Sequence, residues 1–194
     1  RDQCSIGARE ADEVEHNTIS VDGSANPTTG DAGWGIVVTP KGSKVMGDGA
    51  GTKAFAGPVT TDPDHEDFCG AYQKTNNTAE LSALIMAMNY IYNNFEAPGR
   101  IDILYDSTWA ANVARRIWRP KVNKIISGRL QRVVEKVTEA GHQLEWHHVK
   151  AHKGHVLNEL ADAAADKGSR LAALRRVRVA LPQRRPARRR AAAA

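Results

Sequence analysis

One stretch near the amino terminus, residues 18–38, constrains the fold of this chain more than any other. Two runs of β-branched and aromatic residues, Ile19–Val21 and Trp34–Val38, flank a centre rich in Gly, Asn, Pro and Thr. This pattern predicts a β-hairpin with a long connection. Asp22 directly follows the first run, although a strand interior disfavours Asp. Its carboxylate either caps the turn or belongs to a charged site, because an unpaired buried charge is costly.

The remaining segments predict alternating helices and strands. After the hairpin we expect a strand over residues 44–51, a helix from Asn76, a strand over 101–105, helices over 109–118 and 123–140, a strand over 143–149 and a helix over 158–167. The helix from Asn76 carries one apolar stripe, with Asn77 or Thr78 as its N-cap. The order β-β-β-α-β-α-α-β-α predicts a mixed α/β fold with helices packed on a mixed sheet.

Composition and charge divide the chain into three parts. At 194 residues it suits one domain with tails, which we place at 1–17 (a polar leader or linker), 18–170 (the folded domain) and 171–194 (an Arg-rich, disordered tail). The net charge of +5 becomes −3 without the eight tail arginines, so the tail predicts nucleic-acid contact or nuclear targeting. No apolar run approaches the roughly 20 residues of a membrane span. The polar amino terminus and two distant cysteines predict an intracellular protein.

Four acidic residues stand at the ends of predicted elements: Asp22, Glu80, Asp106 and Asp162. Each also has a local explanation, such as a cap or, for Glu80, the dipole of the first helical turn. Asp166 is expected on the outer helix face, and His147, His148 and His155 at the surface or in the core. The acidic segment 55–69 fits a solvated insertion better than a metal site, and Trp34 and Trp146 are expected in the core.

With their flanking residues, these acids resemble the type 1 ribonuclease H family. The matching segments are Val21-Asp-Gly-Ser24 with Asn26-Pro27, Thr75-Asn-Asn-Thr-Ala-Glu80, Tyr105-Asp-Ser107, Val149-Lys-Ala-His-Lys-Gly-His155 and Asn158-Glu-Leu-Ala-Asp162. The resemblance covers about residues 18–168. It implies a five-stranded mixed sheet with helices on both faces, and endonucleolytic cleavage of the RNA strand of RNA–DNA hybrids to 5′-phosphate and 3′-hydroxyl ends.

The resemblance also assigns roles to residues. Asp22, Glu80, Asp106 and Asp162 match the metal-binding carboxylates, and His152 matches a mobile histidine that assists proton transfer. The expected hybrid-binding residues are Gly23, Ser24, Asn26, Asn76, Asn77, Ser107 and Thr108, together with the basic residues Arg115, Arg116, Arg119, Lys121 and Lys124. In-line phosphodiester hydrolysis independently favours two Mg²⁺, for which Mn²⁺ can substitute, because paired ions activate water and stabilise the leaving oxygen. Mg²⁺ prefers such hard oxygen ligands.

The chain departs from many bacterial family members in one segment. Residues 109–123 are too short for their basic helix-loop protrusion, as in retroviral ribonuclease H domains. The chain therefore fits either a monomeric domain of a retroelement-like polyprotein with a reverse transcriptase, or a stand-alone enzyme whose Arg-rich tail contacts phosphates. Two other functions stay open at this point: a non-catalytic module that binds hybrids, and a DNA-cutting nuclease of the same superfold.

Overall fold

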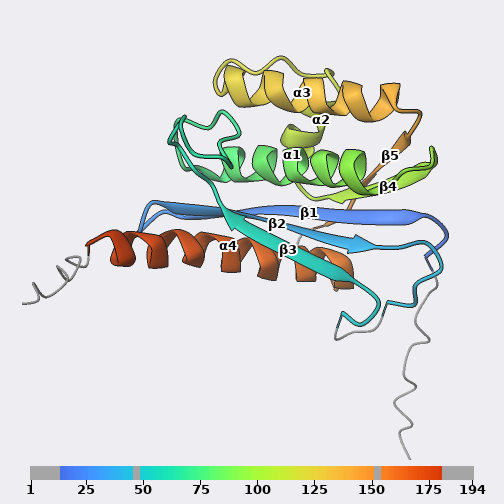
Figure 1. Ribbon diagram of the computed structural model, residues 1–194, viewed down its shortest axis with the longest axis horizontal. Helices are drawn as coiled ribbons and strands as arrows, with labels where there is room; N and C mark the ends of the chain where they lie inside the picture. The colour runs from blue at the N-terminus through green and yellow to red at the C-terminus, as the bar shows by residue number, and fades with distance from the viewer. Residues whose placement is uncertain (1–13, 46–48, 151–153, 181–194) are drawn as a thin grey trace, which may run out of the picture.

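The computed structural model of the chain (Figure 1) describes residues 14–45, 49–150 and 154–180, with the backbone alone for 172–180. Its five strands are β1 (Asn17–Asn26), β2 (Asp31–Thr39), β3 (Lys53–Pro58), β4 (Arg100–Tyr105) and β5 (Gln143–His148). They form one sheet in the order β3-β2-β1-β4-β5. The pairs β1–β2 and β2–β3 are antiparallel, and the pairs β1–β4 and β4–β5 are parallel. The predicted mixed five-stranded sheet and the order of its elements are therefore confirmed.

Four helices cover both faces of the sheet. They are α1 (Asn76–Asn94), α2 (Thr108–Ala114), α3 (Lys124–Glu139) and α4 (Val156–Ala180). Figure 1 shows α1 on one face with α3 stacked beyond it, and α4 along the opposite face. Among the described residues, no helix has the length and apolarity that a membrane crossing requires.

The core follows from the apolar periodicity of these elements. The predicted stripe of α1 is fully buried and packs with Ile19, Val21, Ile101 and Ile103 of the sheet; its members are Leu81, Leu84, Ile85, Met88 and Ile91. The alternate side chains of β2 and β4, Val37 and Leu104, point to the α4 face. Alternation along each strand thus supplies two apolar layers, as a sheet covered on both faces requires.

Several predicted boundaries are wrong, and backbone geometry explains the first two. The strand expected over 44–51 lies instead at 53–58, because Gly49 and Gly51 take positive φ values of 84° and 85°, which a strand cannot hold. The helix expected to reach Trp118 ends at Ala114, and Arg116 follows in the left-handed region at φ 62°. The N-cap of α1 is Thr75, not Asn77 or Thr78.

The last helix is longer than predicted. It passes through Gly168 and continues to Ala180, so the first part of the expected tail is helical. A Cβ at Gly168 would lie 2.5 Å from the carbonyl oxygen of Gly57, so this glycine allows close packing on β3 and does not end the helix. At the other end, Val14 donates its backbone N–H to Ser43 at 3.0 Å, which ties the end of the predicted leader to the domain.

Candidate active site

Three of the four predicted carboxylates converge at one edge of the sheet. Asp22 lies in β1, Asp106 directly follows β4, and Glu80 lies in α1. One carboxylate oxygen from each residue lies within 4.8 Å of the other two. Because β1 and β4 are parallel neighbours with Ser20 opposite Leu104, Asp22 of β1 and Asp106 after β4 lie level with each other. The group of Asp22, Glu80 and Asp106 is called the carboxylate triad below.

Close backbone packing brings Glu80 to this edge. A Cβ on Gly23 would lie 2.2 Å from the backbone nitrogen of Glu80 and 2.4 Å from the carbonyl carbon of Ala79. Only glycine lets β1 and α1 approach this closely. Glu80 is 4% exposed and lies beyond the first turn of α1, so its carboxylate lies inside the protein and the alternative of a first-turn dipole contact is wrong.

A reciprocal pair of hydrogen bonds holds the start of α1. The backbone N–H of Thr78 donates to the Thr75 hydroxyl at 3.2 Å, and the backbone N–H of Thr75 donates to the Thr78 hydroxyl at 2.9 Å. This capping box satisfies donors that a helix start leaves without partners. The two exposed residues that follow Thr75, Asn76 and Asn77, begin the helix that carries Glu80.

Burial and mutual repulsion determine the protonation of the triad. Asp22 is 6% exposed, and its burial, with repulsion from Asp106 and Asp162, raises its pKa to about 8. The backbone N–H of Gly23 donates to Asp22 Oδ1 at 2.7 Å and opposes this rise. Burial also raises the pKa of Glu80 well above its usual value, and repulsion from Asp22 and Asp106 adds to the rise. The triad is therefore a place where positive charge is favourable.

This donor set fits a divalent cation. Three carboxylates offer the hard oxygen ligands that Mg²⁺ and Mn²⁺ prefer. A bound cation would also relieve the burial and repulsion that raise the pKa values of Asp22 and Glu80. Within the described residues, this is the group that brings three such donors so close together.

Asp162 approaches the triad from the other face of the sheet. It lies in α4, is partly exposed, and its charge contributes to the raised pKa of Asp22. It does not belong to the three-residue group whose oxygens lie within 4.8 Å. His152, the remaining predicted catalytic residue, lies outside the described residues.

The predicted hybrid-binding residues in the β1–β2 turn have internal hydrogen bonds. Asn26 Oδ1 accepts from the backbone N–H groups of Thr28 and Thr29 at 2.9 and 3.1 Å. The Ser24 hydroxyl donates to Asp166 Oδ1 at 2.5 Å. These contacts order the segment that follows Asp22 and limit which polar groups it can offer to a ligand.

The other predicted contacts flank α2. Ser107 caps α2 by accepting from the backbone N–H of Ala110 at 3.4 Å, and Thr108 is exposed beside it. The basic residues of the α2–α3 connection are all exposed: Arg115, Arg116, Arg119 and Lys121. The Arg116 guanidinium also pairs with Glu135 of α3.

Sequence reasoning missed the apolar part of this basic surface. Trp118 is 46% exposed and Val122 is 64% exposed, between the basic side chains. A cleft of about 540 Å³ lies alongside, lined by Tyr72, Gln73 and residues 121–125. Trp118 was predicted to lie at the end of a helix. Had the helix been predicted to end at Ala114, Trp118 would have stood in a basic connection and indicated an exposed aromatic residue there. The two tryptophans expected in the core, Trp34 and Trp146, are partly buried and pack against it.

Two further residues lie near the triad: His148, which is exposed as predicted, and Asp166. His148 Nε2 lies 3.2 Å from the carbonyl oxygen of Asp106, and this acceptor requires a protonated Nε2. Asp166 faces the sheet and accepts from Ser24, so its expected position on the outer face is wrong. By contrast, His147 pairs at the surface with Asp102, at 3.1 Å, and His155 is exposed.

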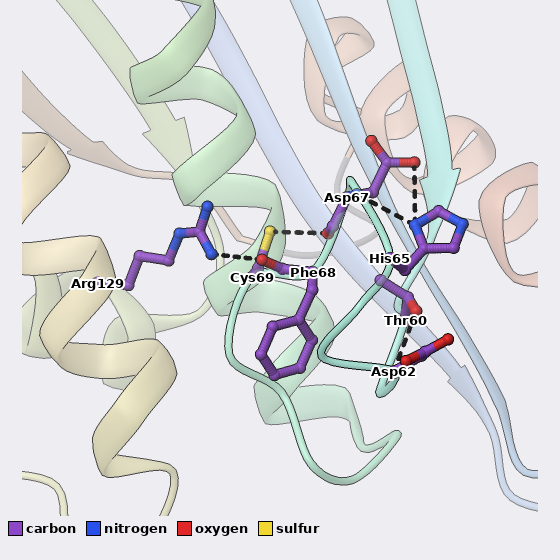
Figure 2. A network of polar contacts seen from close by, with 7 residues as sticks. All are labelled: Thr60, Asp62, His65, Asp67, Phe68, Cys69 and Arg129. Atoms are coloured by element: carbon purple, nitrogen blue, oxygen red, sulfur yellow. Dashed lines mark hydrogen bonds and ion pairs between the residues drawn. The ribbon is translucent and has the colours of Figure 1, made fainter.

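The acidic segment after β3 uses its polar groups to build turns (Figure 2). His65 Nδ1 accepts from the backbone N–H of Asp67 at 3.1 Å, and the Cys69 thiol donates to the Asp67 carbonyl at 3.4 Å. The Arg129 guanidinium of α3 donates to the carbonyl of Phe68 and docks the segment on the domain. Burial raises the pKa of the Cys69 thiol to about 11, so this thiol is not a reactive nucleophile.

Comparisons with known proteins agree with this fold. The RNase H family model matches residues 15–170. The chain is 30% identical over 159 residues to a ribonuclease H of Herminiimonas arsenicoxydans, covering 80% of this chain and 95% of that protein. It is 29% identical over 168 residues to a ribonuclease H of Ralstonia nicotianae, covering 82% and 95%.

Solved structures share the fold at lower identity. LC11-RNase H1, isolated from compost, aligns with a TM-score of 0.56 at 21% identity, covering 79% of this chain and 98% of that one. The same protein in complex with an RNA/DNA hybrid aligns with a TM-score of 0.54 at 20% identity, covering 78% and 97%. With the match to the family model over most of its length and the carboxylate triad in place, the chain belongs to the RNase H family and is a ribonuclease H enzyme.

Proposed function

We propose that the chain hydrolyses the RNA strand of RNA–DNA hybrids at the carboxylate triad with two Mg²⁺, for which Mn²⁺ can substitute. The observation that carries this proposal is the convergence of Asp22, Glu80 and Asp106, buried and close enough to share a cation. The related LC11-RNase H1 has been solved with an RNA/DNA hybrid, which supports the same substrate class here.

Each of the four carboxylates is assigned to one or both of the cations. Asp22 interacts electrostatically with each of the other three acids. Asp106 and Asp162 raise the pKa of Asp22, and Asp22 raises the pKa of Glu80. We therefore assign Asp22 to both ions, Asp162 to the ion that activates water, and Glu80 with Asp106 to the ion at the leaving group. When bound, two Mg²⁺ supply an activated water, neutralise phosphate charge and stabilise the departing 3′ oxygen. The products are 5′-phosphate and 3′-hydroxyl ends.

The chain contributes proton transfer and substrate orientation. His152 lies in the segment between β5 and α4, and we assign it proton transfer near the scissile phosphate. Asn76 and Asn77, exposed at the start of α1, carry amides that can contact the minor groove of a hybrid, where RNA displays its 2′-hydroxyls. Gly23, Ser24, Asn26, Ser107 and Thr108 border the same edge of the sheet.

The basic residues of the α2–α3 connection provide phosphate contacts. Arg115, Arg119 and Lys121 are exposed there, and Trp118 lies among them. Phosphate contacts dominate affinity for nucleic acids, and aromatic side chains add stacking. The five arginines of residues 181–194 are further candidates for phosphate contacts. Salt dependence of hybrid binding with and without residues 181–194 measures their share.

One experiment separates this function from its rivals. The full chain is incubated with Mg²⁺ and sequence-matched RNA–DNA hybrid, double-stranded RNA or double-stranded DNA, with Asp22→Asn as the control. We expect cleavage of the RNA strand of the hybrid alone, and none by Asp22→Asn. Hybrid binding without cleavage would identify a binding module, and cleavage of double-stranded DNA would identify a DNA-cutting nuclease. End-labelling of the products tests the predicted 5′-phosphate.

The same preparation tests whether the chain acts by itself. The curated relatives are matched over 95% of their own length, so the chain contains the equivalent of a whole relative. Activity of the isolated chain at ordinary salt would support a stand-alone enzyme. Activity that requires an attached polymerase would support the polyprotein arrangement.

A further inference from the structure

Asp166 connects α4 to the strand that carries Asp22. Its Oδ1 accepts the Ser24 hydroxyl at 2.5 Å, and the Asp166 side chain is partly buried. Ser24 lies two residues after Asp22 on the same face of β1, and Asp166 lies one helical turn after Asp162. The hydrogen bond therefore joins two pairs of residues, Asp22 with Ser24 on the strand and Asp162 with Asp166 on the helix.

The spacing within these two pairs matches. Two residues of a strand advance by about 6.6 Å, and four residues of a helix advance by about 6 Å. In Figure 1, α4 runs in the same direction as β1 along the sheet. Contact between Ser24 and Asp166 therefore places Asp162 level with Asp22, which agrees with the effect of Asp162 on the pKa of Asp22.

Glycines of β2 form part of the contact between α4 and the sheet, beside the larger side chains of Val37, Leu104 and Leu157. A Cβ on Gly33 would lie 2.0 Å from the backbone nitrogen of Ser169, and one on Gly35 would lie 2.4 Å from the carbonyl oxygen of Ala161. Such contacts set the distance between helix and sheet. At these glycines no side chain stands between helix and strand, so interlocking side chains there do not fix the position of the helix along the strand. The directional hydrogen bond between Ser24 and Asp166 can fix this position.

We propose that Asp166 is a positioning residue that acts through Ser24 to hold Asp162 beside the carboxylate triad, where Asp162 completes the divalent-cation site. This inference rests on the metal-dependent part of the proposed function. Its essential element is acceptance of a hydrogen bond by Asp166, not the negative charge of Asp166 and not direct coordination.

Two variants of Asp166 separate these roles. Asp166→Asn keeps an oxygen that accepts from Ser24 but removes the charge, whereas Asp166→Ala removes both. Ser24→Ala removes the donor and leaves the charge of Asp166 in place. The double variant Ser24→Ala with Asp166→Ala tests whether the two residues act as one unit. Glu96→Gln, at an exposed position, is the control for loss of one negative charge.

The readout is Mg²⁺ affinity of the full chain without nucleic acid, measured by titration calorimetry, and the Mg²⁺-dependent shift in melting temperature. We expect Ser24→Ala and Asp166→Ala each to weaken Mg²⁺ binding about tenfold, as for other residues that orient metal ligands. The double variant should have the same Mg²⁺ affinity as whichever single variant binds Mg²⁺ less tightly, because both changes remove the same hydrogen bond. Asp166→Asn and Glu96→Gln should bind like the unaltered chain.

Other results would overturn the proposal. If Asp166→Asn bound Mg²⁺ as weakly as Asp166→Ala, the charge of Asp166 or direct coordination would be what matters. If Ser24→Ala bound Mg²⁺ like the unaltered chain, Asp166 would not act through Ser24. If Ser24→Ala and Asp166→Ala were less stable in EDTA but kept their Mg²⁺ affinity, the hydrogen bond between Ser24 and Asp166 would have a structural role alone. If the unaltered chain binds Mg²⁺ but cleaves no hybrid, the proposed function fails while these comparisons still decide the role of Asp166. If Asp166→Ala does not fold, Ser24→Ala and Asp166→Asn decide it.

Discussion

The backbone nitrogen of Glu80 lies only 2.2 Å from where a Cβ on Gly23 would stand. Strand β1 and helix α1 thus touch through their backbones at the residue that follows Asp22. This approach brings a carboxylate from a helix next to one from a strand, and any side chain at position 23 would separate them. The packing of two layers and the geometry of the site therefore depend on the same glycine.

Gly23→Ala should accordingly destabilise the protein and abolish cleavage. The added methyl group meets backbone atoms of Ala79 and Glu80, which cannot rotate away, so α1 must shift. Overpacking of this kind costs about 1–3 kcal/mol or more. Chemical denaturation measures the loss. Gly99→Ala is the matched control, because its Cβ would meet nothing within 4 Å, and its stability should be unchanged.

Asp22→Asn should stabilise the metal-free protein near pH 8 while eliminating activity. The amide can still accept from the backbone N–H of Gly23, but it removes a buried charge that repels Asp106 and Asp162. Calorimetric scans in EDTA and in Mg²⁺ should show a higher melting temperature in EDTA than for the unaltered chain, and a much smaller shift with Mg²⁺. A full Mg²⁺ shift in this variant would contradict the central role of Asp22.

An acidic residue outside the site provides the contrast. Asp102 pairs with Arg100 at 3.2 Å and with His147 at 3.1 Å on the partly exposed surface of β4 and β5. Asp102→Asn should therefore lower stability slightly, by at most about 1 kcal/mol, and leave the Mg²⁺ shift intact. The two Asp→Asn changes should therefore shift the melting temperature in EDTA in opposite directions. The Asp22 charge is repelled by its neighbours, whereas the Asp102 charge is paired.

Stability of the metal-free protein should depend on pH through Asp22. Its pKa is about 8 in the folded chain, against about 3.9 unfolded. Between these values the folded chain retains a proton that the unfolded chain has lost, so the free energy of unfolding falls as pH rises from about 4 to about 8. The raised pKa of Glu80 acts in the same direction.

Comparison with Asp22→Asn isolates this effect from other titrating groups. The difference in melting temperature between the two proteins in EDTA should be smallest near pH 4 and largest near pH 8. Mg²⁺ competes with the bound proton, so Mg²⁺ affinity should increase over the same interval. A difference that does not vary with pH would show that Asp22 is ionised in the folded protein throughout.

The sequence predicted the architecture because its information is local. The β-branched, apolar runs at residues 19–21 and 34–38, and the stripe from Leu81 to Ile91, are each visible within one element. The order of elements then restricts the sheet to few arrangements. The family resemblance placed Asp22 and Asp106 together, and the parallel register of β1 and β4 brings them level. The third strand failed where glycines at positive φ interrupt an extended segment.

The parts that sequence could not supply depend on contacts between elements. Asp166 sits on an Ala-rich helix whose faces look alike, so its direction is decided by the glycines of β2 that admit α4. His148 reaches the carbonyl of Asp106 because β5 pairs with β4 in the register that sets Tyr105 opposite His148. Neither relationship has a local sequence signal.

The capping box of α1 should affect substrate binding more than chemistry. Thr75 accepts from the backbone N–H of Thr78, and the next residues, Asn76 and Asn77, are the exposed amides proposed to contact the hybrid. Thr75→Val removes the acceptor, which costs about 1 kcal/mol, and loosens the first turn that presents both amides. Glu80 lies a turn further into the helix and is buried. We therefore expect a raised KM for hybrid with little change in kcat.

Two further variants serve as controls for Thr75→Val. Thr75→Ser keeps the hydroxyl and should restore KM, while Thr138→Val, near the exposed end of α3, removes a hydroxyl that bonds only within its own helix and should leave KM unchanged. Steady-state kinetics on a matched hybrid separates the two constants. A fall in kcat at constant KM would place the effect at Glu80, because the cap would then hold the carboxylate triad and not the substrate contacts.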